Sequence, residues 1–232
     1  MMNQIEQKIS DGEAATGRLP AHEVIYRQLR DLVLYGDLAP GQAVTIQGLT
    51  GRLGAGMTPV REAIRRMIAE GALEFQGNRR VCVPQLSADN ISELIFARQW
   101  LEPHLTLRAT PRASLDDLED LTQMDMALDK AIETGDLRAY LELNYGFHRR
   151  IYDIAGAPIL AELAEGLWLR FGPSLRVVCG RMGTQNLPDK HKELLMAMRA
   201  RDGEAAARAA REDAIQGMEQ VRVCLEVSEA GH

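Results

Sequence analysis

The sequence has few cysteines and no long apolar run, and both absences exclude classes of protein. No stretch approaches the roughly 18 consecutive apolar residues of a membrane-spanning helix, and residues 1–20 contain no apolar core like that of a signal peptide. The three cysteines, Cys82, Cys179 and Cys224, lie far apart and form no Cys-x-x-Cys pair. They therefore indicate neither a disulfide framework nor a thiolate zinc site. We expect a cytoplasmic protein that does not span a membrane.

The net charge is unevenly distributed along the 232 residues. The overall charge of −6 argues against a nucleic-acid partner, because DNA binding draws on lysine and arginine. Residues 20–85, however, contain eight arginines and no lysine against six acidic residues, which is a net charge of +2. Residues 86–232 contain 17 basic and 24 acidic residues, which is a net charge of −7. We therefore expect a flexible tail over 1–19, one domain over 20–85 and a second domain over 86–228.

Residues 20–85 show the pattern of three short helices. Apolar residues recur at helical spacing from His22 to Gly36, and residues 46–53 form a second, shorter helix. A third helix is predicted to begin with Thr58 as its N-cap and Pro59 at its first position. One face of this helix is apolar, and another carries the cations Arg61, Arg65 and Arg66.

A predicted β-hairpin follows the third helix. Residues 72–75 and 80–83 alternate like short strands around an arginine-rich tip. Three helices and a hairpin are typical of a winged helix-turn-helix domain, in which a helix fits the DNA major groove and the hairpin reaches the flanking DNA. Cationic helix faces are more often simply solvated, but the basic hairpin and the glycine-rich turn before the third helix favour DNA binding. A phosphate-binding loop over 51–58 is rejected, because Met57 stands where that loop requires lysine.

Four segments of this domain have a distinctive order and spacing. They are Gly36–Gly41 (Gly-Asp-Leu-Ala-Pro-Gly), residues 49–54, Thr58–Ile64 (Thr-Pro-Val-Arg-Glu-Ala-Ile) and Glu70–Leu73 (Glu-Gly-Ala-Leu). Together they resemble the GntR superfamily of bacterial transcription regulators. This resemblance implies that the recognition helix, the start of the helix before it and the wing contact operator DNA. The matching positions are Gln47, Gly56, Met57, Thr58, Arg61, Gly77, Asn78 and Arg79.

Two features depart from the family pattern. Gly56-Met57 replaces the usual Ser-Arg ahead of Thr-Pro, and Arg80 replaces the usual glycine of the wing. Because Arg65 and Arg80 can still contact phosphates, we expect an altered operator preference rather than a loss of DNA binding.

The second domain shows six or so amphipathic helices. They are predicted to begin near Ser87, Ser114, Asp136, Pro158, Asp189 and Gly203. The fourth is expected to end at Trp168, with an irregular stretch from Gly172 to Pro188. The predicted fold is thus mainly α, with a winged helix-turn-helix domain followed by an all-α antiparallel bundle. Residues 87–228 resemble the effector domain of the FadR-like (FCD) branch of the superfamily.

Four polar side chains are expected to meet inside this bundle. Asn144 and His148 lie four residues apart and therefore share one helix face. His191 and Asp213 each lie 11 residues from Asp202, so antiparallel packing about that turn places them side by side. Their nitrogen and oxygen donors suit Zn, Ni, Mn or Fe(II). The spacing alone is a weak signal, and a pocket holding two neutral histidines without metal is the alternative.

The resemblance to the FCD branch strengthens the metal prediction. Many FCD domains bind a divalent metal through an Asp or Asn, a His four residues later, a second His and a third His. Asn144, His148 and His191 match the first three positions, whereas Asp213 stands where the third His is expected. A carboxylate is a harder ligand, in the hard–soft sense, than an imidazole, so this exchange affects which metal the site prefers.

Arg98 is the candidate effector ligand. It lies in a segment that resembles the Arg-x-x-x-Glu of the first effector-domain helix of the family. If Arg98 faces the cavity, its guanidinium would bind a small carboxylate through two parallel hydrogen bonds. An ion pair with Glu102, four residues later, explains the motif equally well.

These features predict a bacterial transcription regulator that binds a palindromic operator as a homodimer and responds to a small organic acid or sugar acid. The resemblance favours a repressor. No nucleophile elbow, His-Glu-x-x-His motif or dinucleotide fingerprint is present, so we expect no enzymatic activity. Two alternatives stay open: a metal-dependent enzyme built on Asn144, His148, His191 and Asp213, and an effector-independent DNA-binding dimer.

Overall fold

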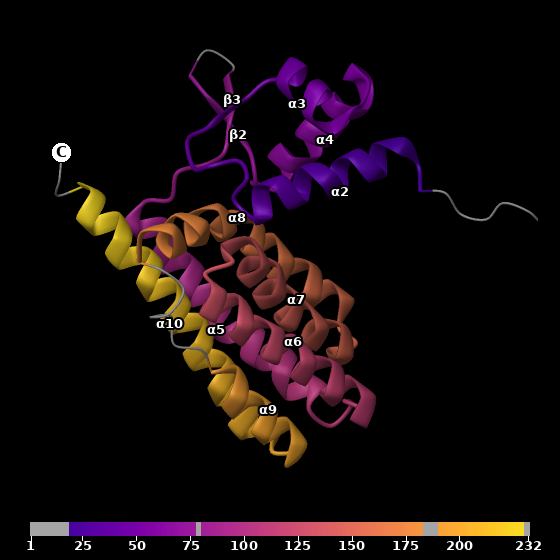
Figure 1. Ribbon diagram of the computed structural model, residues 1–232, viewed down its shortest axis with the longest axis vertical. Coiled ribbons are helices and arrows are strands. Elements are labelled where there is room, and N and C mark those ends of the chain that lie inside the picture. Colours follow the sequence, from indigo (N-terminus) through magenta and orange to yellow (C-terminus); the bar gives the residue numbers. More distant parts are fainter. Residues whose placement is uncertain (1–18, 78–79, 183–189, 230–232) are drawn as a thin grey trace, which may run out of the picture.

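The computed structural model describes residues 19–77, 80–182 and 190–229. Figure 1 shows a small N-terminal part above a bundle of long helices, and α2 of the N-terminal part lies against the bundle. Apart from Leu19, the predicted tail over 1–19 lies outside the described residues. The mainly helical fold with a small wing sheet confirms the predicted fold class.

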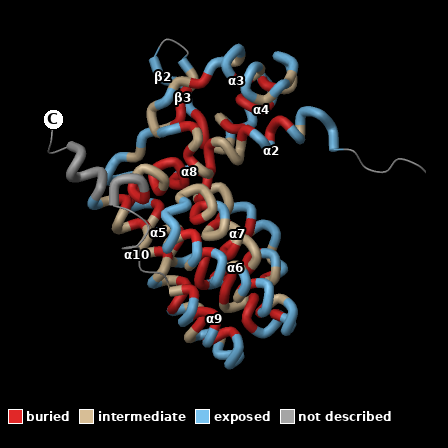
Figure 2. Tube along the Cα trace, in the orientation of Figure 1, coloured by how far each residue is buried: buried red, intermediate tan, exposed pale blue. Residues whose placement is uncertain are grey.

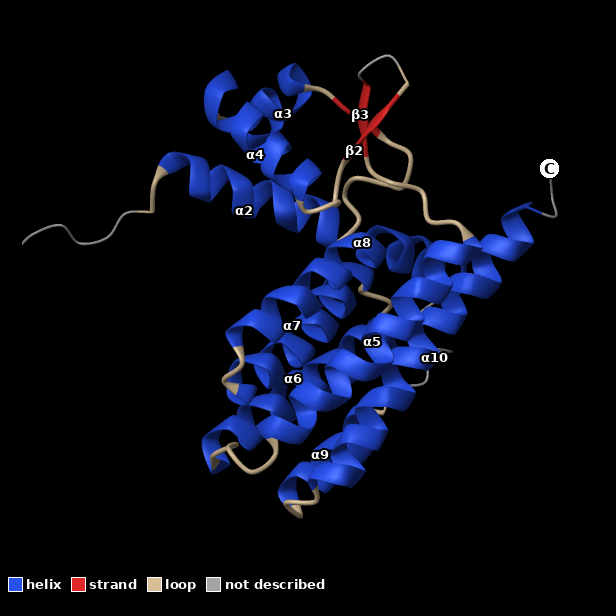
Figure 3. Ribbon diagram, turned by 180° about the vertical axis from the view of Figure 1, so that it is seen from behind, coloured by secondary structure: helices blue, strands red, loops and turns tan. Residues whose placement is uncertain are grey.

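Three helices and a small sheet form the N-terminal part. The elements are α2 (Ala21–Leu34), β1 (Ala43–Val44), α3 (Ile46–Leu53), α4 (Met57–Ala69), β2 (Glu74–Gln76) and β3 (Arg80–Cys82). The predicted hairpin is present as β2 and β3, and β1 pairs with the other edge of β3, so that the sheet has the order β1-β3-β2. Figure 3 shows the strands of this wing from behind, beyond the top of the bundle.

The recognition helix begins two residues earlier than predicted. Gly56 is the N-cap of α4 in an extended conformation (φ −70°, ψ 162°), so Thr58 is not the cap. Pro59 is then the third helical residue. It still lies in the first turn, where a backbone N–H has no partner within the helix, so its ring costs the helix no hydrogen bond.

Six helices form the C-terminal bundle. They are α5 (Ala88–Ala109), α6 (Leu115–Thr134), α7 (Leu137–Ala155), α8 (Pro158–Met182), α9 (His191–Arg199) and α10 (Gly203–Glu229). Ser87 and Ser114 form capping boxes with the residues three positions later, and the side chain of Asp136 caps α7. These caps lie where the sequence predicted them, because each uses contacts within one turn.

The prediction of an irregular stretch from Gly172 to Pro188 was wrong for residues 172–182, and residues 183–188 lie outside the described residues. Helix α8 continues through Gly172 and Pro173 to Met182. Phe171, Leu175 and Val178 are buried at helical spacing in this part of the helix, which packs against α2, α5, α7 and α10. Burial of this face offsets the cost of about 3 kcal/mol for an internal proline.

Helix α5 lies within the bundle and contacts α7, α8 and α10. Figure 2 shows buried residues along the inward sides of the helices. Most of these side chains are apolar, but Arg98 and Glu102 of α5, Asp125 of α6, His148 of α7 and His191 of α9 are also buried. Buried charged and imidazole groups are rare without partners, so this polar interior marks the candidate site.

The capping box of α6 provides a test of helix stability. Asp117 accepts hydrogen bonds from the backbone N–H and hydroxyl of Ser114 at 2.8 Å, and from Arg150 of α7 at 2.7 Å. We expect Asp117→Ala to lower the free energy of unfolding by about 1 kcal/mol, measured by urea denaturation. The matched control is Asp116→Ala, which removes a neighbouring exposed charge; an equal loss in both variants would contradict the capping role.

The effect of Asp117→Ala should depend on pH. The Ser114 backbone and hydroxyl bonds, together with Arg150, hold the pKa of Asp117 below its ordinary value. A carboxyl group with a lowered folded-state pKa stabilises the fold above its unfolded-state pKa of about 3.9, and this contribution is lost as the pH falls through the folded-state pKa. The difference between wild type and Asp117→Ala should therefore shrink in acid.

Candidate metal centre and DNA-binding surface

The start of α4 presents an exposed surface suited to DNA. Met57 is 59% exposed, and Thr58 and Arg61 are also exposed, whereas Val60 on the opposite face is buried. Arg61 makes no ion pair with any described residue. Arg65 is exposed too, and its guanidinium donates to Glu62 at 2.8 Å. Of the two arginines, Arg61 is therefore the one whose charge is not already paired.

The other predicted DNA contacts lie around this helix start. Gln47 on α3 and Gly56 before α4 are exposed, as are Gly77 and Arg80 at the wing. Gly77 has a φ of +52°, a left-handed conformation that favours glycine in the hairpin turn. Asn78 and Arg79 lie outside the described residues.

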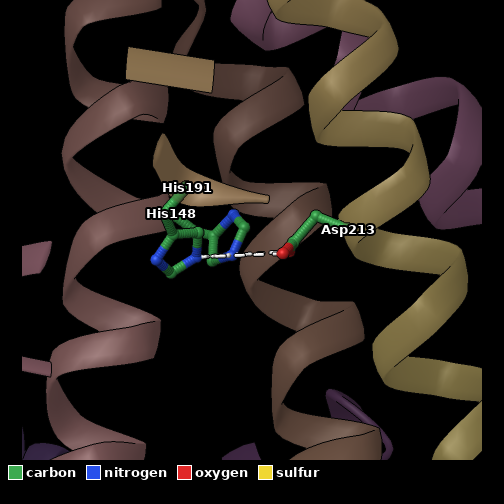
Figure 4. Close-up of side chains that lie close together, drawn as sticks. All are labelled: His148, His191 and Asp213. Carbon is green, nitrogen blue, oxygen red and sulfur yellow. Dashed lines mark hydrogen bonds and ion pairs between the residues drawn. The ribbon is translucent and has the colours of Figure 1, made fainter. Parts of the chain in front are cut away.

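Three of the four predicted metal ligands converge inside the bundle. Figure 4 shows His148 of α7, His191 of α9 and Asp213 of α10 pointing toward one another. The Nε2 atom of His148 lies 3.2 Å from Asp213 Oδ2 and 3.3 Å from Nε2 of His191, and His191 Nε2 lies 4.0 Å from Asp213 Oδ1. One donor atom from each residue can be chosen so that all three lie within 4.8 Å of one another.

The Asp213 carboxylate is held in its ionised form. Burial acts to raise its pKa, but the hydrogen bond with His148, the nearby His191 and the backbone N–H of Lys190 together lower that pKa well below its ordinary value. The Lys190 N–H donates to Asp213 Oδ1 at 3.2 Å. An ionised carboxylate facing two imidazole nitrogens is a donor set for a divalent cation.

Asn144 approaches the cluster from the same helix as His148. It lines a cavity of about 30 Å³ together with Arg98, Trp168 and Asp213. Gln216 of α10 lines it as well, and its side-chain oxygen is buried without a hydrogen-bond partner among the described residues. The cavity is thus lined both by polar side chains and by the aromatic rings of Trp168 and Phe171.

Arg98 is paired within the site and is not a free cation. Its guanidinium donates to Glu102 Oε1, and it lies over the rings of Trp168 and Phe171, at 4.8 Å and 4.1 Å from their centroids. The ion pair considered for the Arg-x-x-x-Glu segment is therefore present, and Arg98 also lines the cavity, whereas effector binding by Arg98 stays a prediction.

Two further carboxylates stand behind the histidines. Glu102 Oε2 lies 3.6 Å from His148 Nδ1, and Asp125 Oδ1 lies 3.4 Å from His191 Nδ1. Beside these carboxylates, His148, His191 and Asp213 present largely buried nitrogen and oxygen donors close to one another, and this donor set fits a divalent metal ion.

Two parts of the chain match known protein families. Residues 21–83 match "Bacterial regulatory proteins, gntR family", and residues 93–214 match the FCD domain. The chain belongs to the GntR family. It is similar to the HTH-type transcriptional regulator McbR of Escherichia coli strain K12, with 30% identity over 183 residues, which cover 78% of this chain and 83% of McbR. The HTH-type transcriptional repressor RspR of the same strain is 25% identical over 204 residues, covering 88% of this chain and 90% of RspR.

The solved structure of E. coli McbR/YncC has the same fold as this GntR regulator. The TM-score is 0.81 at 27% identity, and the match covers 91% of this chain and 100% of that chain. The family and these relatives identify a DNA-binding transcriptional regulator and not an enzyme. No described helix of the GntR regulator is long and apolar enough to cross a membrane.

Sequence reasoning missed the role of Asp125 and noticed Glu102 only as a partner of Arg98. A signal for Asp125 was present, because it interrupts the apolar stripe of α6 between Leu121 and Leu128. A carboxylate at a core position of an amphipathic helix indicates a buried partner. The identity of that partner, His191, depends on how α6 and α9 pack.

Proposed function

We propose that this GntR regulator is a repressor whose operator binding responds to a small organic acid or sugar acid bound beside a divalent metal ion. The observation that carries the proposal is the buried convergence of His148, His191 and Asp213 below an exposed recognition helix. The relative RspR is named a transcriptional repressor, which supports repression rather than activation. Because operator DNA lies in the bacterial cytoplasm, the protein would act there.

His148, His191 and Asp213 would hold the metal, with Asn144 as a fourth ligand. A bound Zn, Ni, Mn or Fe(II) ion would supply coordination positions that a carboxylate oxygen can occupy. The protein's own part is to present ionised Asp213 together with two imidazoles that are almost fully buried. The Asp213 carboxylate also makes the set harder than one with three imidazoles.

Effector binding requires the cavity to open. At about 30 Å³ the cavity has room for roughly one or two water molecules and not for an organic acid. An acid that entered beside Arg98 would therefore displace side chains of α5, α8 or α10. A ligand that binds only the opened arrangement shifts the protein toward it, and this is how effector binding would alter the DNA-competent state.

Helices α7 and α8 connect this cavity to the DNA-binding domain. Arg30 of α2 donates to the Tyr145 hydroxyl at 2.7 Å and to Glu165 of α8 at 2.9 Å. The rings of Tyr145 and His148 lie 5.5 Å and 5.2 Å from the ring of Trp168. Displacement of Trp168 by an effector would therefore also displace Tyr145, and through its contact with Arg30 it would shift α2.

The functional form would be a homodimer. GntR regulators bind operator DNA and often form dimers. In a dimer on a palindromic operator, the two recognition helices would enter successive major grooves about one DNA turn apart. An effector that changes the setting of α2 would alter this spacing and weaken binding.

Arg61→Ala is the substitution that tests operator binding. If Arg61 reads a base, the variant should bind operator DNA about 1–3 kcal/mol more weakly; if it contacts phosphate, the slope of affinity against salt should fall by about one. The measurement is a gel shift or fluorescence titration with the DNA upstream of the protein's own gene at several salt concentrations.

The matched control for this test is Arg27→Ala. Arg27 is an exposed arginine of α2 that pairs with Glu23 and lies outside the recognition helix. The Arg27→Ala substitution removes one positive charge from the same domain and should leave the affinity for operator DNA nearly unchanged. Equal losses in both variants, or wild-type protein without sequence preference, would contradict the proposed surface.

A further inference from the structure

We propose that Asp125 and Glu102 are positioning residues, which hold the outer nitrogens of His191 and His148 so that both Nε2 atoms face Asp213. This inference rests on the proposed metal site. It assigns a role to two buried carboxylates that do not themselves belong to the predicted ligand set.

The His191 side chain is fixed from two directions. Its Nδ1 lies 3.4 Å from Oδ1 of Asp125, while its ring stacks on Phe147 with the centroids 4.0 Å apart and the planes at 17°. The Asp125 side chain is only 6% exposed, and its Oδ1 has no conventional hydrogen bond among the described residues. The close approach to His191 Nδ1 therefore gives this buried carboxylate of α6 a polar neighbour.

The His148 side chain has the same arrangement on the other side of the cluster. Its Nδ1 lies 3.6 Å from Oε2 of Glu102, whose other oxygen accepts from Arg98. Trp168 lies against the ring of His148 with the centroids 5.2 Å apart. Glu102 thus divides its two oxygens between the candidate effector ligand and a candidate metal ligand.

A carboxylate near Nδ1 selects which nitrogen of a neutral imidazole carries the proton. The Nδ1–H form is attracted to the carboxylate, and it leaves the lone pair on Nε2. In this protein both Nε2 atoms lie within hydrogen-bond distance of a partner in the cluster, at 3.3 Å from each other and, for His148, at 3.2 Å from Asp213. A metal ion bound by both Nε2 atoms would displace any proton from them, and Asp125 and Glu102 favour the Nδ1–H form that this requires.

The chain offers a matched pair of substitutions between the same two helices. Asp125 of α6 faces His191 of α9, and one turn later Asp129 of α6 pairs with Lys192 of α9 at 2.9 Å. Asp125→Asn removes the carboxylate charge behind the imidazole, whereas Asp129→Asn removes an exposed ion pair. Both variants lose one charge from the α6–α9 contact, and only the first alters the setting of a histidine.

The first measurement is Zn²⁺ affinity, by calorimetric titration of chelator-stripped full-length protein. Asp125→Asn should weaken Zn²⁺ binding about 10- to 100-fold, and Asp129→Asn should stay within about twofold of wild type. Equal affinity in Asp125→Asn and wild type would overturn the positioning role. Wild-type protein that binds no Zn²⁺, Ni²⁺, Mn²⁺ or Fe²⁺ would instead overturn the proposed metal site.

The second measurement reads the tautomer directly, in full-length protein loaded with Zn²⁺. Long-range proton–nitrogen NMR distinguishes Nδ1–H from Nε2–H imidazole. Wild-type His191 and His148 should both be Nδ1–H, and Asp125→Asn should shift His191 alone toward the other form. Nε2–H at His191 in the Zn²⁺-loaded wild type would overturn the inference.

Discussion

Replacing His191 with glutamine should abolish metal stabilisation of this GntR regulator. The imidazole lies with its Nε2 in the cluster and is almost fully buried, so no side chain from solvent can take its place. For wild-type protein, metal at about 100 times its dissociation constant should stabilise the fold by about 2.7 kcal/mol. For a chain of this length, this corresponds to a rise in melting temperature of roughly 5–10 °C. The His191→Gln variant should show no rise.

His104→Gln is the control for this experiment, because His104 lies exposed on α5 away from the buried cluster. It should keep the full metal-induced rise, measured by thermal unfolding of chelator-treated protein with and without added Zn²⁺ or Ni²⁺. The same rise in His191→Gln would mean that the metal binds elsewhere. No rise in the wild type would favour the effector-independent DNA-binding dimer.

Gly172→Ala should produce the largest loss of stability among single methyl additions to α8. A Cβ atom built at Gly172 would lie 2.3 Å from the backbone oxygen of Leu34 at the end of α2. A backbone atom cannot rotate away, so α2 and α8 must separate. Overpacking of this kind costs about 1–3 kcal/mol or more. Because α2 belongs to the DNA-binding domain, the variant should also weaken the link between effector binding and operator release.

Gly166→Ala is the same substitution on the same helix. A Cβ at Gly166 meets no described atom within 4 Å, so alanine there should stabilise α8 by about 0.5–1 kcal/mol through its better helix propensity. Urea denaturation of both variants should therefore give changes of opposite sign. If Gly172→Ala were as stable as Gly166→Ala, the close approach of α8 to Leu34 would be wrong.

The helix starts and the wing could be predicted because their signals are local. The Ser87 and Ser114 capping boxes and the Asp136 cap each involve residues three positions apart. Such bonds form within one turn and do not depend on the rest of the fold. The recognition helix was placed two residues late, because an extended glycine and a threonine are both acceptable N-caps.

The length of α8 could not be predicted, because its second half depends on distant residues. Glycine and proline within a helix are local signals that it ends, so Gly172 and Pro173 led to the prediction of an irregular stretch there. The structure overrides them through burial of Phe171, Leu175 and Val178, a contribution that exists only once the other helices surround α8. Strand β1 was missed for a similar reason, since its two residues become a strand by pairing with β3.

The sequence by itself determined the class of this protein and predicted four candidate metal ligands, three of which lie together in the structure. The arginine distribution, the motif spacing and the helical register of His148 with Asn144 are properties of the linear chain. Tertiary structure decided what surrounds those positions. Only the packing of α6 on α9 brings Asp125 to His191, and only α5 within the bundle places Glu102 between Arg98 and His148. Contacts between helices depend on their relative rotation and separation, which the periodicity of one helix does not specify.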